Sequence, residues 1–387
     1  MKTIAVFFGG QSPEHDISVI TGIQAFHTFD TSKYLPIPIY MSHEGLFYTG
    51  KNIANTNKYK DINTLLEESE QVQIKKTKNG TFLSIKKVFG FKEIKIDCVF
   101  VAFHGGGGEG GSFQGFCETL NLPYTGCDVL GSALCMDKAS TKKVLAHAGI
   151  PVSPYKISLE DEFIKNKEKL LKEIETEIPY PLFVKPSNGG SSIGISRAKN
   201  RNELENALEL SFSFDSKALI EQEFVHDAEI NISCLGNWDS EINLSFCEEV
   251  YSESDFLDFE NKYLKGSKSK KITTPSGSKG MASTSRCIPA LIKDDIKIQI
   301  ETYAKKAFKA LNCGGVVRID FLLNKKNNSL VLIEVNTIPG SFAFYLWEPK
   351  GLPFNKLINK MIDLSFEKYE NKVKHARKFN SSVFKNL

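Results

Sequence analysis

The stretch from Val316 to Pro349 reads VVRIDFLLNKKNNSLVLIEVNTIPGSFAFYLWEP. Two apolar segments, 316–323 and 330–335, flank a polar turn at 325–329, and this pattern predicts a β-hairpin with buried strands. Each strand carries an acid, Asp320 in the first and Glu334 in the second. Asn336 shares the face of Glu334 because strand side chains repeat with a period of two. The hairpin therefore brings three oxygen donors together on otherwise apolar strands.

Two explanations fit these acids. Buried carboxylates without enough basic partners are costly unless a hard cation joins them, and Mg²⁺ bound to the phosphates of a substrate would do so. Arg318 lies on the face of Asp320, where its guanidinium would stabilise a developing phosphoryl or acyl oxyanion. The other explanation is structural, with Arg318 and Asp320 paired to each other. The hairpin alone leaves both explanations open.

The composition is that of an ordinary globular protein. The chain has 387 residues, of which 41% are hydrophobic and 25% are charged. A chain of this length is long enough for two or three domains and a large core. Lys and Arg total 49 against 46 Asp and Glu, a net charge of +3. This balance gives no nucleic-acid-binding footprint.

The sequence also indicates a compartment. The apolar runs are shorter than the roughly 20 residues of a membrane span, and the N-terminus enters a strand without a signal peptide. The eight cysteines form no CxxC pair and are expected to be core residues in a reducing environment. A cytoplasmic enzyme or binding protein is therefore expected.

An α/β unit opens the chain. The run KTIAVFF at 2–8 ends at two glycines, and the sequence becomes helical after Pro13, which predicts a strand, a turn and a helix. The glycines lack the third spacing of a dinucleotide fingerprint. Glu14 starts the helix and, taken alone, is a helix-capping carboxylate.

Two glycine-rich segments follow expected strands. The strand 96–103 runs into 104–112, a segment that starts with His104 and offers many unobstructed backbone N–H groups. The strand 182–186 carries Lys185 and is followed by a Ser/Gly loop at 187–194. A lysine in an apolar strand indicates an anion, and such a loop can cover phosphates as a lid. Because the lysine precedes the glycines, this is not a P-loop.

The remaining pattern predicts further elements. The polar segment 248–286 is expected to be a long functional or disordered loop. Helices are expected at 113–120, 132–148, 292–311 and 354–369, and strands at 34–40, 45–48, 81–85, 218–225 and 229–235.

Taken together, these segments resemble the D-alanine:D-alanine ligase family of the ATP-grasp ligases. Each motif is weak or moderate alone, but the ordered set is highly specific and covers roughly two-thirds of the chain. The matching pieces are FFGGQSPEHDIS, AFHGGGGEGGSFQGFCETLNLPYTG, SALCMDKASTKKVLAHAGIPVSPY, FVKPSNGGSSIGIS, ENKYL, VVRIDFLL and LIEVNTIPG.

The resemblance implies an α/β fold with the three-domain ATP-grasp architecture. The expected parts are an N-terminal Rossmann-like domain at 1–128, a small ATP-grasp lobe at 129–222 and a C-terminal ATP-grasp lobe at 223–369. The C-terminal lobe would contain the metal site and a long loop at 250–286. A basic tail at 370–387 would follow. The resemblance also suggests a homodimer through the N-terminal domain.

The resemblance further implies how the nucleotide and metal are bound. It favours the metal explanation of the hairpin, because Asp320, Glu334 and Asn336 match the ligands of two Mg²⁺ ions, for which Mn²⁺ can substitute. The loop 187–194 matches the lid over ATP. Position 222 is usually Glu in the family, and the amide of Gln222 can still accept a hydrogen bond from adenine. The ATP-binding matches are Lys138, Lys185, Ser192, Gln222, Glu223, Phe224, Val225 and Glu229.

On the amino-acid side, Glu14 matches the acid that holds the ammonium of the first substrate, which replaces its interpretation as a helix cap. Ser191 and Tyr263 match its hydrogen-bonded partners, and His104 matches a residue near the first carboxylate. Arg318 and the Gly340 N–H match the stabilisers of the oxyanion. The remaining expected substrate contacts are Lys262, Ser341 and Tyr345.

The implied reaction joins two D-alanine molecules for peptidoglycan synthesis. ATP phosphorylates the carboxylate of the first, and the amine of the second attacks the acyl phosphate and releases phosphate. The protein contributes orientation, charge neutralisation and exclusion of water.

The acceptor side departs from the family pattern. The segment 341–348 is aromatic and longer than usual, and Tyr345 stands where the family commonly has a serine. D-alanine in both positions is the first expectation. A mixed ligase with D-serine, D-lactate or another amino acid as acceptor is the second. A non-catalytic nucleotide- or amino-acid-binding regulator is the alternative of another class, although the expected phosphate lysines and metal ligands are all present.

Overall fold

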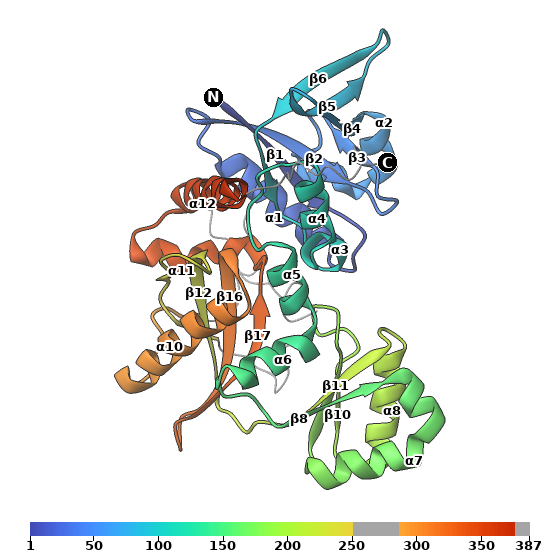
Figure 1. The fold of residues 1–387 in the computed structure, drawn as a ribbon, viewed down its shortest axis with the longest axis vertical. Coiled ribbons are helices and arrows are strands. Elements are labelled where there is room, and N and C mark those ends of the chain that lie inside the picture. Colours follow the sequence, from blue (N-terminus) through green and yellow to red (C-terminus); the bar gives the residue numbers. More distant parts are fainter. Residues whose placement is uncertain (251–285, 376–387) are drawn as a thin grey trace, which may run out of the picture.

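The computed structural model describes residues 1–250 and 286–375. These residues form three β-sheets with helices packed around them (Figure 1). The predicted segment 250–286, with Lys262 and Tyr263, therefore lies almost entirely outside the described residues, as does most of the expected basic tail.

The N-terminal sheet has seven strands in the order β6-β5-β4-β3-β2-β1-β7. β1 pairs in parallel with β2 and β7, whereas β3 to β6 pair antiparallel. The strands are β1 (Lys2–Gly9), β2 (Tyr34–Met41), β3 (Phe47–Thr49), β4 (Glu70–Thr77), β5 (Gly80–Lys86), β6 (Phe91–Ile96) and β7 (Cys98–Val101). The helices are α1 (His15–Thr28), η1 (Thr56–Lys60), α2 (Ile62–Glu67), α3 (Gly106–Glu109) and α4 (Ser112–Thr119).

The sequence analysis missed β4 and β6. Both strands are largely exposed and rich in charged residues, so they carry little of the apolar alternation that marks a half-buried strand. They lie in the long antiparallel projection at the top of Figure 1.

The small lobe has a four-stranded sheet in the order β10-β9-β11-β8, covered by two helices. Its apolar core contains only residues between 163 and 220, so the lobe has a core of its own. Figure 1 shows it set apart from the rest of the molecule. Its elements are β8 (Tyr155–Leu159), α7 (Glu160–Glu177), β9 (Leu182–Pro186), β10 (Ser196–Ala198), α8 (Arg201–Phe212) and β11 (Lys217–Gln222).

The C-terminal lobe is built on a sheet in the order β15-β14-β12-β16-β17, with β13 paired to β12. The expected hairpin is confirmed as β16 and β17. The strands are β12 (Ala228–Asn237), β13 (Asn243–Leu244), β14 (Glu248–Val250), β15 (Arg286–Cys287), β16 (Gly314–Asn324) and β17 (Ser329–Asn336). The helices are α10 (Asp294–Ala310), η4 (Gly340–Ala343), α11 (Phe344–Trp347), η5 (Glu348–Lys350) and α12 (Phe354–Lys374). α12 runs five residues beyond the expected end at 369.

The helix expected at 132–148 is in fact two helices, α5 (Val129–Met136) and α6 (Lys138–His147). Asp137 separates them with extended backbone, and its side chain accepts a hydrogen bond from the Ser140 N–H at 2.8 Å. A capping aspartate of this kind starts a new helix rather than continuing the old one. Both helices pack into the core of the C-terminal lobe through residues such as Cys135 and Leu145.

The largest core joins the two ends of the chain. It runs from the N-terminal sheet to α12 and to the loop after β17, where Phe342 and Trp347 are buried. One continuous core therefore holds both the N-terminal strands and the loop that follows the hairpin. Seven of the eight cysteines are buried, which confirms that they serve as core residues.

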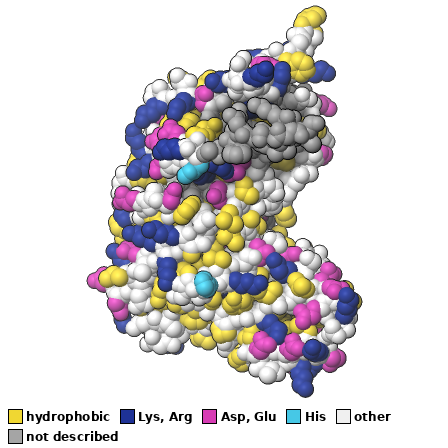
Figure 2. Space-filling view, in the orientation of Figure 1, with side chains coloured by type: hydrophobic (Ala, Val, Ile, Leu, Met, Phe, Trp, Pro, Cys, Tyr) yellow, Lys and Arg dark blue, Asp and Glu magenta, His cyan; other side chains and the backbone are white. Residues whose placement is uncertain are grey.

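On the face shown in Figure 2, positive and negative side chains are interspersed. Among the described residues, the structure contains no helix with both the length and the apolar character that crossing a bilayer requires.

Candidate active site

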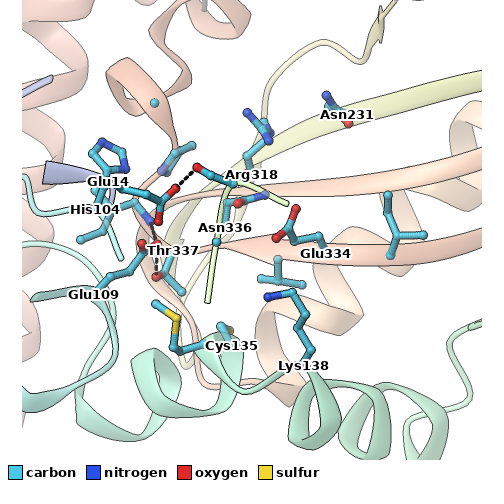
Figure 3. Close-up of a pocket in the computed structure, with 18 of the residues that line it drawn as sticks. Glu14, His104, Glu109, Cys135, Lys138, Asn231, Arg318, Glu334, Asn336 and Thr337 are labelled. Atoms are coloured by element: carbon cyan, nitrogen blue, oxygen red, sulfur yellow. Dashed lines mark hydrogen bonds between the residues drawn. The ribbon is translucent and has the colours of Figure 1, made fainter. Parts of the chain in front are cut away.

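Two adjoining cavities collect the predicted site residues. The first cavity lies between the N-terminal sheet, the hairpin and the tip of the loop 187–194 (Figure 3). The second lies between the small lobe and the hairpin. Predicted residues that line the first are Glu14, His104, Lys138, Ser191, Glu229, Arg318, Glu334, Asn336 and Gly340. Those that line the second are Lys138, Lys185, Ser192, Gln222, Glu223, Phe224, Glu229, Asp320 and Glu334.

The hairpin places its polar residues as the period-two pattern predicts. Asp320 pairs across the strands with Glu334, and Arg318 with Asn336. Arg318 and Asp320 form the ion pair of the structural explanation, with Nε to Oδ1 at 2.8 Å and Nη2 to Oδ2 at 2.7 Å. Asn336 Nδ2 also donates to Asp320 Oδ2 at 2.9 Å. The ion pair and the gathering of oxygen donors thus coexist.

The donor set of the hairpin fits a hard cation. Among the described residues, no three His, Cys, Asp or Glu side chains gather as a self-sufficient metal site. Asp320, Glu334 and Asn336 instead supply two carboxylates and an amide beside the two cavities. Mg²⁺ is usually held by one or two carboxylates together with the phosphates of a substrate and with water. A partial set of protein oxygens is therefore the chemistry that this ion takes.

The loop 187–194 closes over Glu14. Ser191 Oγ donates a hydrogen bond to Glu14 Oε1. Glu14 lies between β1 and α1 of the N-terminal domain, whereas Ser191 lies between β9 and β10 of the small lobe. The neighbouring Gly190 has no room for a side chain, because a Cβ there would lie 2.4 Å from Glu14 Oε2. Ser191 and Ser192 both have left-handed backbone, with φ of 54° and 61°. Such strain is typical of loops that clamp a ligand.

His104 is buried on the same side of the cavity. Its Nε2 lies 3.0 Å from Thr21 Oγ1. Burial, with a smaller contribution from the positive charge of Arg318, lowers the pKa of His104 to about 4. The imidazole is therefore neutral at physiological pH and acts as a hydrogen-bonding group rather than as a cation.

The two predicted phosphate lysines reach the cavities from different elements. Lys138 starts α6, and its Nζ donates to the Gly189 carbonyl in the loop. Burial lowers the pKa of Lys138, and the nearby Glu334 carboxylate opposes that effect. Lys185 extends from β9, and its Nζ lies 2.5 Å from Glu221 Oε2. Each lysine is thus positioned by a neighbouring protein group.

The second cavity is lined by most of the residues that were predicted to bind adenine and ribose. Gln222, Glu223 and Phe224 line it at the end of β11, and Glu229 lies at the start of β12. Val225 is 75% exposed and is not among the described residues that line this cavity, and its carbonyl accepts from Asn324 Nδ2 at 3.0 Å. The structure therefore brings three of the four predicted adenine-binding residues to this cavity, and the role of all four stays a prediction.

The turn after Gly340 is strained. Ser341, Phe342 and Ala343 all have left-handed backbone, with φ of 51°, 54° and 49°. Such a conformation is unfavourable for residues with a Cβ, by roughly 1–2 kcal/mol each. Phe342 anchors the turn, because it is buried and its ring lies 5.0 Å from that of Phe100 in the large core. The core thus holds Gly340 at the cavity.

Two residues that were predicted to contact the acceptor lie outside the lining of the first cavity. Within the described part of the chain, neither Ser341 nor Tyr345 lines the first cavity. The Ser341 N–H donates to Thr21 Oγ1 at 3.3 Å, and the Tyr345 hydroxyl donates to Glu248 Oε1 at 3.3 Å. The structure thus pairs the Ser341 backbone with Thr21 and the Tyr345 hydroxyl with Glu248.

The sequence analysis missed Glu109, which lines the first cavity. Its Oε1 accepts from Thr337 Oγ1 and from the Ile338 N–H, both at 3.0 Å, and its Oε2 accepts from the Gly105 N–H at 2.9 Å. Glu109 therefore ties the glycine-rich segment to the residues that follow Asn336. An acid within the glycine run was its only sequence signal.

The raised pKa of Glu109 makes the free energy of unfolding depend on pH. Burial and the negative charge of Glu14 raise the pKa of Glu109 from an ordinary 4.5 to about 7. The hydrogen bonds that Glu109 accepts act in the opposite direction and lower its pKa. A raised carboxyl pKa means that the native state holds the proton longer, so this contribution is present below pH 4.5 and is lost as pH rises through 7. We expect Glu109→Gln to show a smaller fall in unfolding free energy between pH 5 and pH 8 than the wild type, in urea titrations.

The control is Glu67→Gln, at an exposed position on α2, which should keep the wild-type pH dependence. An unchanged pH dependence in Glu109→Gln would show that Glu109 does not titrate in this range.

Comparison with known proteins agrees with this geometry. The family model "D-ala D-ala ligase N-terminus" matches residues 3–127, and "D-ala D-ala ligase C-terminus" matches residues 144–363. The D-alanine--D-alanine ligase of Thermosipho melanesiensis is 37% identical over 96% of each chain. That of Pelodictyon phaeoclathratiforme is 38% identical over 94% of this chain and 98% of its own.

Two solved structures are also similar. The D-alanine-D-alanine ligase from Coxiella burnetii is 27% identical, with a TM-score of 0.77 over 96% of each chain. The VanG D-Ala:D-Ser ligase from Enterococcus faecalis is 31% identical, with a TM-score of 0.77 over 94% of this chain and 99% of the other. The fold is therefore the ATP-grasp architecture, and the chain belongs to the D-Ala-D-Ala ligase family.

Proposed function

We propose that this protein is an ATP-dependent, ADP-forming ligase that joins two D-alanine molecules for peptidoglycan synthesis. One observation carries the proposal: Ser191 contacts Glu14 at the wall of one cavity, next to a second cavity that is lined by Lys185 and Glu229. The relatives that bear the name D-alanine--D-alanine ligase support it.

The residues divide the work of donor activation. Glu14 and Ser191 hold the ammonium of the first D-alanine, and His104 lies beside its carboxylate. Lys138 and Lys185 neutralise the phosphates of ATP, while Gln222, Glu223 and Phe224 receive the adenine and Glu229 the ribose. The lid loop 187–194 excludes water from the acyl phosphate, which would otherwise hydrolyse.

Arg318 and the Gly340 N–H lie at the same cavity and would stabilise the oxyanion that forms when the acceptor amine attacks. In the structure Asp320 accepts two hydrogen bonds from Arg318. Asp320, Glu334 and Asn336 would hold Mg²⁺ or Mn²⁺, which supplies charge neutralisation at the phosphates. Asp320 would then serve both the metal and Arg318.

A mixed ligase is the second candidate. Two observations favour it: the similarity to a D-Ala:D-Ser ligase, and the presence of Tyr345 in the acceptor segment. By the family resemblance we also propose a homodimer and a cytoplasmic location.

Phosphate release with MgATP decides between these functions. D-alanine, D-serine and D-lactate are supplied singly and in pairs, and the products are identified by mass spectrometry. We expect D-alanine alone to give D-alanyl-D-alanine and ADP. Turnover only with a pair would establish the mixed ligase, and no ATP turnover with any substrate would establish the non-catalytic regulator.

A further inference from the structure

The first cavity extends past Arg318, away from Glu14. The far wall comes from three strands of the C-terminal sheet and is formed by Asn231 on β12, Glu248 and Val250 on β14, and Arg286 on β15. In Figure 3 Asn231 lies beyond Arg318 on the side opposite Glu14 and His104. No predicted site residue belongs to this wall.

Glu248 is the centre of the wall. It is only 1% exposed, and it accepts hydrogen bonds from three directions. Arg286 Nη1 donates to Oε2 at 2.8 Å, Asn231 Nδ2 donates to Oε1 at 3.2 Å, and the Tyr345 hydroxyl donates to Oε1 at 3.3 Å. A buried carboxylate is stable only with such partners.

Tyr345 also orients Arg286 through its ring. The guanidinium carbon of Arg286 lies 4.2 Å from the centre of the Tyr345 ring. Cation–π contact on one face and an ion pair at one edge restrict a long side chain to one arrangement. The aromatic residue that replaces the family's serine is therefore a platform for an arginine.

A second observation indicates a ligand at this wall. Asn231 is 3% exposed, and its Oδ1 has no hydrogen-bond partner among the described residues. A buried polar atom without a partner is costly and uncommon in native proteins. A ligand with an N–H group in this part of the cavity would satisfy it.

We propose that Arg286 binds the carboxylate of the acceptor amino acid, with Glu248 and Tyr345 as positioning residues. The proposal rests on the proposed function and deepens it. The donor end of the cavity contains the acids Glu14 and Glu109. The far wall instead pairs its acid, Glu248, with an oriented guanidinium whose planar fork matches a carboxylate. Arg286 thus takes the contact with the acceptor that the sequence analysis expected of Tyr345.

The test compares two acceptors in one reaction. D-alaninamide has an amine but no carboxylate, so it can accept an acyl group but cannot be phosphorylated. With D-alanine, D-alaninamide and MgATP together, mass spectrometry gives the ratio of D-alanyl-D-alanine to D-alanyl-D-alaninamide. We expect Arg286→Met to lower this ratio by about 10- to 100-fold, the value of one hydrogen-bonded charge pair.

Hydroxylamine reports on the donor half separately. It attacks the acyl phosphate, releases phosphate and forms D-alanyl hydroxamate without using a carboxylate at the acceptor position. Arg286→Met should form hydroxamate at close to the wild-type rate. Arg201→Met, which removes a surface arginine paired with Glu168 and Glu175, should change neither measurement.

Arg286→Met leaves Glu248 buried without its cation and could therefore misfold. Two further variants test the proposal without this problem. Arg286→Lys keeps the charge but loses the fork, and Arg286→Met with Glu248→Gln removes both charges. Both should lower the product ratio. An unchanged ratio in the folded variants, with normal hydroxamate formation, overturns the proposal. Absence of hydroxamate in the wild type instead refutes the proposed function itself.

Discussion

Replacing Glu334 with alanine is expected to lower phosphate release from MgATP by about 1,000-fold, which is typical of removing one preorganised charge from a phosphoryl-transfer site. Glu334 lines both cavities, and its charge opposes the fall in the pKa of Lys138. Without this carboxylate the proposed metal site keeps only Asp320 and Asn336. The fold should persist, because Glu334 is only half-buried and its neighbour Val335 still packs in the core.

The measurement is steady-state phosphate release with D-alanine over a range of Mg²⁺ and Mn²⁺ concentrations. Glu334→Gln separates charge from shape and should be nearly as defective as Glu334→Ala. The control is Glu301→Ala, at a similarly half-buried glutamate on α10 away from both cavities. Turnover of Glu334→Ala within tenfold of the wild type would remove this residue from the metal site.

The hairpin was predictable because its information is local. The alternation of apolar and polar residues in 316–336 determines which side chains share a face, and Asp320 pairs with Glu334 as that pattern requires. The pattern could not decide whether Arg318 pairs with Asp320 or serves a ligand. In the structure Arg318 pairs with Asp320 and also lines the first cavity. The same position of Arg318 is therefore compatible with an ion pair and with contact to a ligand.

The parts that the sequence analysis missed depend on contacts between distant segments. Glu109 meets Thr337 across 228 positions, and Arg286 meets Glu248 across 38 positions. Neither pair has a local signal. The strands β4 and β6 were missed for another reason: they are largely exposed and rich in charged residues, so they lack the apolar alternation of a half-buried strand. The break at Asp137 was missed because a single capping residue hardly alters the periodicity.

Glu221 was missed although its signal was present. It lies in the apolar run KALIEQ, where an acid is as anomalous as Lys185 is in its own strand. In the structure β9 and β11 are adjacent, and Glu221 lies between Lys185 and Lys142, at 2.5 Å and 2.6 Å. Two unexplained charges of opposite sign on apolar strands would have predicted the strand pairing.

Replacing Glu221 with leucine is expected to destabilise the protein by about 3–5 kcal/mol, because it leaves a buried cation without its partner. Lys142 has a side chain that is only 2% exposed and pairs with Glu221. Burial acts to raise the pKa of Glu221, but Lys142 and Lys185 together lower it to about 2. The stabilisation is therefore present above pH 4.5 and is lost as pH falls towards 2.

Urea unfolding at pH 7 measures the loss, and the pair Lys142→Met with Glu221→Leu provides its control. Exchanging both buried charges for apolar side chains should restore most of the stability. It should not restore nucleotide binding, since Lys185 still lacks the carboxylate that holds it at the second cavity. A double variant with both normal stability and a normal KM for ATP would mean that Glu221 serves Lys142 alone. A raised KM in the stable double variant would assign Glu221 the second task of directing Lys185 towards the phosphates.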